Sequence, residues 1–326
     1  MFVLLACAPD PVDTGARADS ADADVIDSAI DADSAADTDS AADTDSATDT
    51  DSAADTGRES GDDTAEDTDV PTPGPCESYA TAVTMGTVDN PDLDELSGLA
   101  VSTLNPGILW THEDSAGAAE LYALDYTGAT VATVHLEGVV NNDWEDLALA
   151  PCGDTWCLAV GEIGTASYEH SLLFLEEPLL VDAEYTIAPD VRPFTYPGDA
   201  EDAEGLALAE DGTAWVVTKR ADATAGVYTL APDADVLEWQ GDVVTGAEGE
   251  DLPARATGAS LYGDALLIRT YLHLYQVDVT ALDVPPESLA FALELQGEAV
   301  AWDPIQGGFW QVAEGSGARL FYTGCE

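Results

Sequence analysis

Positive charge is what this sequence lacks most. Lys and Arg together number 8 among 326 residues, against 65 Asp and Glu, so the formal net charge is −57. Lys219 is the only lysine. Nucleic-acid binding needs a basic surface, so this balance excludes it, and it argues against adsorption to an anionic membrane for the same reason. Such a surface favours cations, cationic partners or saline surroundings.

Long apolar runs and familiar catalytic motifs are also absent. No segment approaches the roughly 20 apolar residues that a membrane-spanning helix needs, and no long run has the 3.6-residue period of an amphipathic helix. The sequence contains no nucleophile elbow, phosphate-binding loop or dinucleotide-binding fingerprint. It therefore predicts little helix and names no reaction.

The first residues resemble an export signal. Leu4-Leu5-Ala6-Cys7 resembles the lipobox of bacterial lipoproteins, in which the chain is cut before the cysteine and the thiol is diacylated. The resemblance implies that residues 1–7 are a signal-peptide remnant and that Cys7 is the lipidation site. Ala8 after the cysteine favours the outer membrane over the inner one. We therefore expect an extracytoplasmic protein that a lipid anchor holds at the outer membrane or cell surface.

Residues 8–75 are predicted to be a disordered acidic tether. The stretch 31–56 repeats Asp-Ser-Ala-Ala-Asp-Thr almost verbatim, and 8–75 contain no aromatic residue. Such a segment cannot bury enough apolar surface to offset the entropy lost on ordering. The tether would connect the anchor to the domain that fills the rest of the chain, 76–326.

Four cysteines remain in that domain, and three pairings are open. Cys152 and Cys157 flank a Gly-Asp turn between two apolar runs, which predicts a hairpin closed by a local disulfide. Cys76 and Cys325 would then join the first and last segments of the domain. An exported protein lies in a compartment that favours both bonds. The alternative is free thiols or a metal site, although the spacings match no zinc template.

Five segments of the domain repeat one pattern. Each begins with a short apolar run, and these runs start 41 to 59 residues apart. A second and a third apolar strand follow every run, and four of the five repeats show a fourth. The five initial runs are 97–100, 145–148, 204–207, 257–260 and 298–301.

Four short strands in each repeat of about 40–50 residues are the signature of a β-propeller. We therefore predict an all-β fold, a β-propeller of five four-stranded blades. The fifth repeat ends without its fourth strand, and residues 79–88 form a strand without a repeat, so this N-terminal strand is expected to close the ring. The insert 181–197 could hide a sixth blade, and a β-sandwich is the alternative fold.

Charged residues gather where the predicted channel opens. In a propeller the first strand of each blade lines the central channel, and its start meets the end of the second strand at one face. The candidate metal or ligand residues there are Glu95, Glu145, Asp146, Glu204, Glu298, Asp114 and Glu162, and the candidate anion-binding or charge-compensating residues are Lys219, Arg220 and Arg269. No catalytic residue is assigned, although His112 beside Asp114 could act as a general base.

Two interpretations of these residues stay open. The glutamates could accept backbone hydrogen bonds and pair with the three cations, which would hold the blades in register, because buried charges need partners. Alternatively, the carboxylates could hold Ca²⁺ through hard oxygen ligands, or act as acid and base, because crowding spreads their pKa values.

Several phrases carry a family resemblance. They include Glu-Leu-Ser-Gly-Leu-Ala at 95–100, Asp-Trp-Glu-Asp-Leu-Ala at 143–148 and Val-Thr-Lys-Arg at 217–220. The stretch 93–322 resembles a family of secreted bacterial β-propeller proteins and is broadly similar to calcium-dependent propeller lactonases and phytase-like esterase propellers. The resemblance implies a propeller and a calcium cofactor.

The expected function is that of a lipid-anchored binding or scaffold module with an acidic site in its central channel. One alternative is a Ca²⁺-dependent hydrolase of an ester, lactone or phosphoester. The other is a carbohydrate-active or carbohydrate-binding propeller, which the tryptophans and tyrosines suggest. We expect a monomer whose partners are the membrane, through the anchor, and a small-molecule, glycan or protein ligand.

Overall fold

The computed structural model describes residues 75–115, 117–165 and 169–326. The predicted lipidation site Cys7 and all but the last residue of the predicted tether 8–75 lie outside the described residues. The described part contains β-strands and one 3₁₀ turn, Leu252–Ala254. None of its helices has the length and apolar character to cross a membrane.

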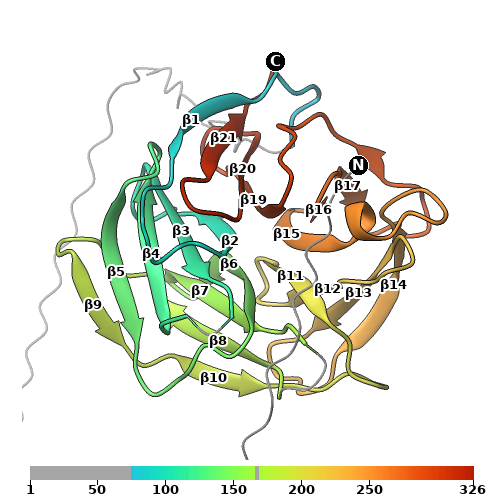
Figure 1. The fold of residues 1–326 in the computed structure, drawn as a ribbon. Helices are drawn as coiled ribbons and strands as arrows, with labels where there is room; N and C mark the ends of the chain where they lie inside the picture. Colours follow the sequence, from blue (N-terminus) through green and yellow to red (C-terminus); the bar gives the residue numbers. More distant parts are fainter. Residues whose placement is uncertain (1–74, 116, 166–168) are drawn as a thin grey trace, which may run out of the picture. The chain divides into compact units, whose positions relative to one another are not determined.

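The strands form five sheets arranged as a ring (Figure 1), so the predicted five-bladed β-propeller is confirmed and the β-sandwich is wrong. The innermost strands β2, β6, β11, β15 and β19 contact one another in turn around the ring. Blade 1 contains β2 (Leu96–Val101), β3 (Ile108–Glu113), β4 (Glu120–Asp125), β5 (Thr130–Leu136) and β9 (Glu184–Ile187). Blade 2 contains β6 (Trp144–Cys152), β7 (Thr155–Glu162), β8 (Ser171–Glu176) and β10 (Asp190–Pro193).

Blades 3 and 4 are formed by consecutive strands, whereas blade 5 joins both ends of the domain. Blade 3 contains β11 (Ala203–Leu208), β12 (Ala214–Thr218), β13 (Thr224–Leu230) and β14 (Glu238–Val244). Blade 4 contains β15 (Ala256–Tyr262), β16 (Ala265–Thr270), β17 (Leu274–Asp278) and β18 (Glu287–Ser288). Blade 5 contains β19 (Gly297–Trp302), β20 (Phe309–Ala313), β21 (Arg319–Thr323) and β1 (Val83–Thr87).

The predicted ring closure is also confirmed. Strand β1 pairs antiparallel with β21, with Val83 opposite Tyr322, and so supplies the fourth strand that the last repeat lacks. The disulfide Cys76–Cys325 fastens this junction, and the second predicted disulfide, Cys152–Cys157, closes the hairpin between β6 and β7. The closure gives blade 5 the same number of strands as blades 2, 3 and 4.

The insert 181–197 contains no sixth blade. Its strand β9 pairs in parallel with β5 as a fifth strand of blade 1, and β10 pairs antiparallel with β8 as the outer strand of blade 2. The insert therefore crosses from one blade to its neighbour. It adds a strand to each existing sheet instead of forming a new one.

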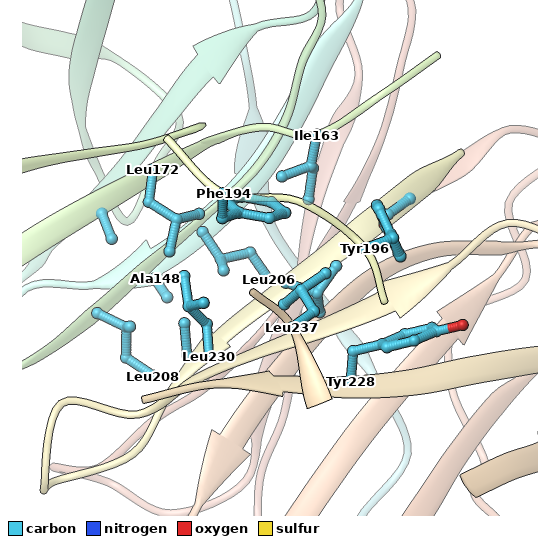
Figure 2. Close-up of a cluster of buried hydrophobic side chains, with 14 of the residues drawn as sticks. Ala148, Ile163, Leu172, Phe194, Tyr196, Leu206, Leu208, Tyr228, Leu230 and Leu237 are labelled. Atoms are coloured by element: carbon cyan, nitrogen blue, oxygen red, sulfur yellow. The ribbon is translucent and has the colours of Figure 1, made fainter. Parts of the chain in front are cut away.

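Apolar side chains fill the spaces between blades. Figure 2 shows the cluster between blades 2 and 3, where Ile163, Phe194 and Leu206 pack together. At its border, the rings of Tyr196 and Tyr228 meet edge to face with centroids 5.1 Å apart. Burying one such side chain stabilises the fold by about 1.5–3 kcal/mol. This packing fixes the innermost strands on which the candidate site is built.

Candidate functional site

Every innermost strand carries a β-bulge near its beginning. In β6, Trp144 and Asp146 pair with consecutive residues of β7, so Glu145 has no partner across the ladder. The same irregularity falls at Glu204 in β11 and at Glu298 in β19. It falls at Thr257 in β15 and between Ser97 and Ala100 in β2. Because a bulge bends the strand and re-aims a side chain, the sequence repeat presents its first residue at one end of the channel.

Five carboxylates converge there from blades 1, 2 and 3. Oxygen atoms of Asp114, Asp143 and Glu145 lie within 4.8 Å of one another, and so do those of Glu145, Asp202 and Glu204. Glu145 therefore belongs to both groups. We call these five residues the acidic end of the channel. Carboxylate groups at this spacing could hold a metal ion.

Lys219 is the cation of this end. Its Nζ donates to Glu204 Oε1 at 2.6 Å and lies 5.4 Å from the centroid of the Tyr271 ring. Burial opposes the charged form of Lys219, but the attraction of Glu204 outweighs it and raises the pKa of the amine. Burial also raises the pKa of the Glu204 carboxyl, and the Lys219 charge opposes that shift. One ammonium group thus faces five carboxyl groups.

Three of the five carboxylates, those of Asp143, Asp202 and Glu145, accept no hydrogen bond within the described residues, and Glu145 is the most buried of the three. Its side chain is buried, with 5% of the residue exposed, and within the described residues its carboxylate accepts no hydrogen bond. Burial, followed by repulsion from Glu204 and Asp114, raises the pKa of Glu145 well above its ordinary value. Burial likewise raises the pKa of Asp114, to about 7. These groups favour either protons or a bound cation.

Gly164 forms a wall of the acidic end. A Cβ at this position would lie 2.1 Å from Glu145 Oε1 and 2.7 Å from Asp143 Oδ2. That Asp143 oxygen is buried and has no hydrogen-bond partner in the described part of the chain. Unpaired, closely grouped carboxylate oxygens fit a hard cation such as Ca²⁺, whereas no histidine or thiol is present among them for zinc.

Asp146 occupies a different place from the other predicted carboxylates. It is fully buried, its Oδ2 accepts from the amides of Leu206 and Ala259 at 2.9 Å each, and its Oδ1 accepts from Leu147 at 2.8 Å. It therefore ties blades 2, 3 and 4 together at the channel axis. Its oxygens are engaged by backbone donors and are not turned toward the acidic end.

The remaining predicted acids surround the acidic end without joining either carboxylate group. Glu162 accepts from the amide of Asp143 at 2.8 Å and so positions that ligand candidate. Glu298 is buried, and burial, then repulsion from Glu204, raises its pKa. Glu95 is exposed.

Two of the three predicted cations do not reach the acidic end. Arg220 donates from Nε and Nη2 to both oxygens of Glu201, at 2.6 and 2.8 Å, and from Nη1 to Asp242 at 2.7 Å. Arg269 is fully buried and pairs with Glu294 at 3.0 Å. The expectation that three cations share one position is wrong for these two. They hold strands together within and beside their own blades.

His112 is not placed to act on a ligand. It is fully buried, and burial lowers its pKa to about 4. Its Nδ1 lies 2.9 Å from the carbonyl oxygen of Glu113, and its ring packs edge to face against Trp144. The structure therefore gives His112 a packing position beneath the channel wall.

No family model matches the sequence, and no curated protein matches it. Among solved structures, the PQQ-bound aldose sugar dehydrogenase from Streptomyces coelicolor is similar with 13% identity and a TM-score of 0.49, covering 77% of this chain and 99% of that one. The glutaminyl cyclase of Myxococcus xanthus is similar with 14% identity and a TM-score of 0.47, and the match covers 76% of this chain and 97% of that one. A chain of a nidogen/laminin complex is similar with 12% identity and a TM-score of 0.41, and the match covers 67% of this chain and 72% of that one. These similarities are too distant to carry an activity over to this chain.

Proposed function

We propose that this protein is a binding module that holds a divalent cation, Ca²⁺, at the acidic end of its propeller. The observation that carries the proposal is the Glu145 carboxylate, which is buried and accepts no hydrogen bond within the described residues while it lies beside four other carboxylates. A buried anion without a partner is costly. A divalent cation would supply that partner.

The donor set supports calcium over other metals. Ca²⁺ takes 6–8 oxygen ligands in flexible geometries, and carboxylates of Asp114, Asp143, Glu145, Asp202 and Glu204 surround the position. These residues come from three blades, so a bound ion would also link the blades. Ligand positions that the protein does not fill would be open to oxygen atoms of a partner molecule.

The proposal includes a place in the cell. A lipid anchor at Cys7 and a tether over 8–75 would present the propeller away from the outer membrane or cell surface. There the module would bind a small-molecule, glycan or protein ligand as a monomer. Replacing Cys7 with Ser should release the protein from the membrane fraction, and unchanged fractionation would reject the anchor.

A second candidate is Ca²⁺-dependent hydrolysis of an ester, lactone or phosphoester. The observation that favours it is Asp114, because a carboxyl whose pKa is raised to about 7 can accept a proton near neutral pH. Asp114→Asn should then abolish hydrolysis of a test ester such as p-nitrophenyl acetate. For carbohydrate processing, Trp110, Trp144 and Trp310 are fully buried, so these three tryptophans cannot stack on a sugar.

Calcium titration of the metal-free full chain tests the main proposal. Calorimetry should detect one tight site above the weak binding of the remaining carboxylates, and Glu145→Gln should remove that site. Glu176→Gln is the matched control, because it removes the same charge from an exposed position on β8. If wild type, Glu145→Gln and Glu176→Gln give the same calcium titration curve, the proposed site is rejected.

A further inference from the structure

The end of the channel opposite the acidic end contains a cavity of about 360 Å³. All five innermost strands line it. The four-residue runs that begin these strands carry a small residue at their fourth position, and each of these residues lies in the cavity wall: Ala100, Ala148, Ala207, Ser260 and Ala301. The four alanines also belong to the apolar clusters between blades, so a larger side chain at this repeated position would disturb the packing of neighbouring blades as well as the cavity.

The two ends of the channel are separate. Asp146 lies between them and accepts backbone hydrogen bonds from β11 and β15. Leu99, Leu147 and Leu206 on the adjoining strands are almost completely buried. The lining of the cavity includes none of the five carboxylates of the acidic end, so a molecule in the cavity would not touch them.

The chemistry of the cavity is apolar inside and acidic at its rim. Trp156, Tyr262 and Trp302 add aromatic surface to the aliphatic wall. Glu210, Asp211 and Asp264 lie in the lining and are exposed. The lining that the structure describes contains no Lys, Arg or His.

We infer that this cavity binds a small hydrophobic cation, such as an aromatic quaternary ammonium compound. The apolar wall would take the body of the ligand, and the aromatic faces and rim carboxylates would attract its charge. The same rim repels hydrophobic anions, and a neutral hydrophobe would gain nothing from it. The inference is independent of the proposed calcium site.

Binding of benzyltrimethylammonium to the full chain, measured by tryptophan fluorescence and calorimetry, tests this assignment. The cation should bind at least tenfold more tightly than phenylacetate or benzyl alcohol. Glu210→Gln combined with Asp264→Asn should weaken it by about two- to thirtyfold, since exposed charge pairs contribute about 0.2–1 kcal/mol each and 1.4 kcal/mol is a factor of ten. Glu238→Gln with Asp182→Asn removes two exposed charges elsewhere and should change nothing.

Two further variants locate the ligand. Ala209→Phe places a large ring at a half-buried lining position just beyond β11 and should weaken binding at least tenfold, with the melting temperature as the check on folding. Glu145→Gln should leave binding of the ammonium compound unchanged. The assignment is overturned if the three probes bind equally, if none binds, if the rim pair has no effect, or if Glu145→Gln abolishes binding.

Discussion

The two ends of the channel are built from the same five four-residue runs, yet their chemistry is opposite. The first position of a run faces the acidic end and is Glu in blades 2, 3 and 5. The fourth position lines the apolar cavity and is Ala or Ser in every blade. In blade 2 the bulge falls at the first position, Glu145, and re-aims its side chain toward the acidic end, three residues from the position that lines the cavity.

The residue at the first position also differs among blades, so the blades contribute unequally to the acidic end. In blades 1 and 4 it is Ser97 and Thr257, whose hydroxyl groups donate to the carbonyl oxygens of Glu145 and Gly297 on the next innermost strand. These two blades use the position to join neighbours. The three blades with Glu instead present carboxyl groups, of which Glu204 pairs with Lys219 and Glu145 is a ligand candidate for the proposed cation.

Ring closure should affect both ends alike and by the largest amount. Replacing Cys76 and Cys325 with Ser releases a bond between residues 249 positions apart, which the chain-entropy model values at about 5 kcal/mol. Replacing Cys152 and Cys157 opens a bond of separation 5 at the rim of the apolar cavity and should cost about 2 kcal/mol. Urea unfolding of the two double variants measures this difference. Equal losses would show that the long-range bond does not constrain the ring.

Removing the group between the two ends should come next. Asp146→Ala leaves the amides of Leu206 and Ala259 buried without acceptors, at about 2 kcal/mol each, so the free energy of unfolding should fall by about 4 kcal/mol. Asp146→Asn keeps one oxygen for these amides and should cost less. A loss below about 1 kcal/mol for the Ala variant would contradict the tie between blades.

Calcium should stabilise the protein through the acidic end alone. At a hundredfold excess over Kd the gain is about 2.7 kcal/mol, equivalent to a rise of about 5–10 °C in the melting temperature for a domain of this size. Glu145→Gln should abolish that rise and slightly raise the melting temperature of the metal-free protein, because it removes a repelled carboxyl. Ala209→Phe, at the other end, should keep the full calcium effect. A calcium effect that survives Glu145→Gln would place the ion elsewhere.

The smallest expected effect is a pH dependence. The folded Asp114 releases its proton near pH 7, above the ordinary 3.8 of the unfolded chain. Between about pH 4 and 7 the folded state therefore holds more protons at this site, and its stability falls as pH rises. His112, whose pKa is lowered to about 4, acts in the opposite direction, so the informative quantity is the difference between wild type and Asp114→Asn, both of which keep His112.

In chelator, the free energy of unfolding of wild type relative to that variant should fall by about 1–2 kcal/mol across this range, after allowance for the partial exposure of Asp114. Calcium should reduce the fall, because it replaces the bound proton. A difference that stays constant with pH would show that Asp114 ionises normally in the folded protein.

The repeat made the propeller, its closure and both disulfides predictable, but the direction of single side chains was harder to infer. The register equates Lys219 with Tyr271, because Thr218 and Thr270 pair with the corresponding residues Ala203 and Ala256. Arg269 pairs with Gly258 as Val217 pairs with Gly205, so Arg269 lies two residues before the position that corresponds to Lys219. Arg269 therefore lies further inside its strand, where it is fully buried and pairs with Glu294, and Arg220 follows Lys219 by one residue, so the three cations do not share one position.

Asp146 shows a signal that the sequence did contain. It stands at the second position of its run, where the other blades have Gly98, Gly205, Gly258 and Ala299. The crowded axis leaves room for one side chain, and that carboxylate is taken by backbone amides. That Asp146 accepts backbone hydrogen bonds and is not a ligand candidate could have been predicted from its being the only acidic residue at the second position of the runs. Asp143 and Asp202 precede their strands and lie outside the repeated run, so only the structure brought them to the acidic end.

X-ray diffraction from crystals grown with calcium chloride, recorded at a wavelength where calcium scatters anomalously, tests the central claim most directly. We expect one strong anomalous peak within coordination distance of Glu145 Oε1 and at least two of its neighbouring carboxylates, with no peak in the apolar cavity. An acidic end without a peak, and with peaks only at exposed carboxylates, would contradict that claim.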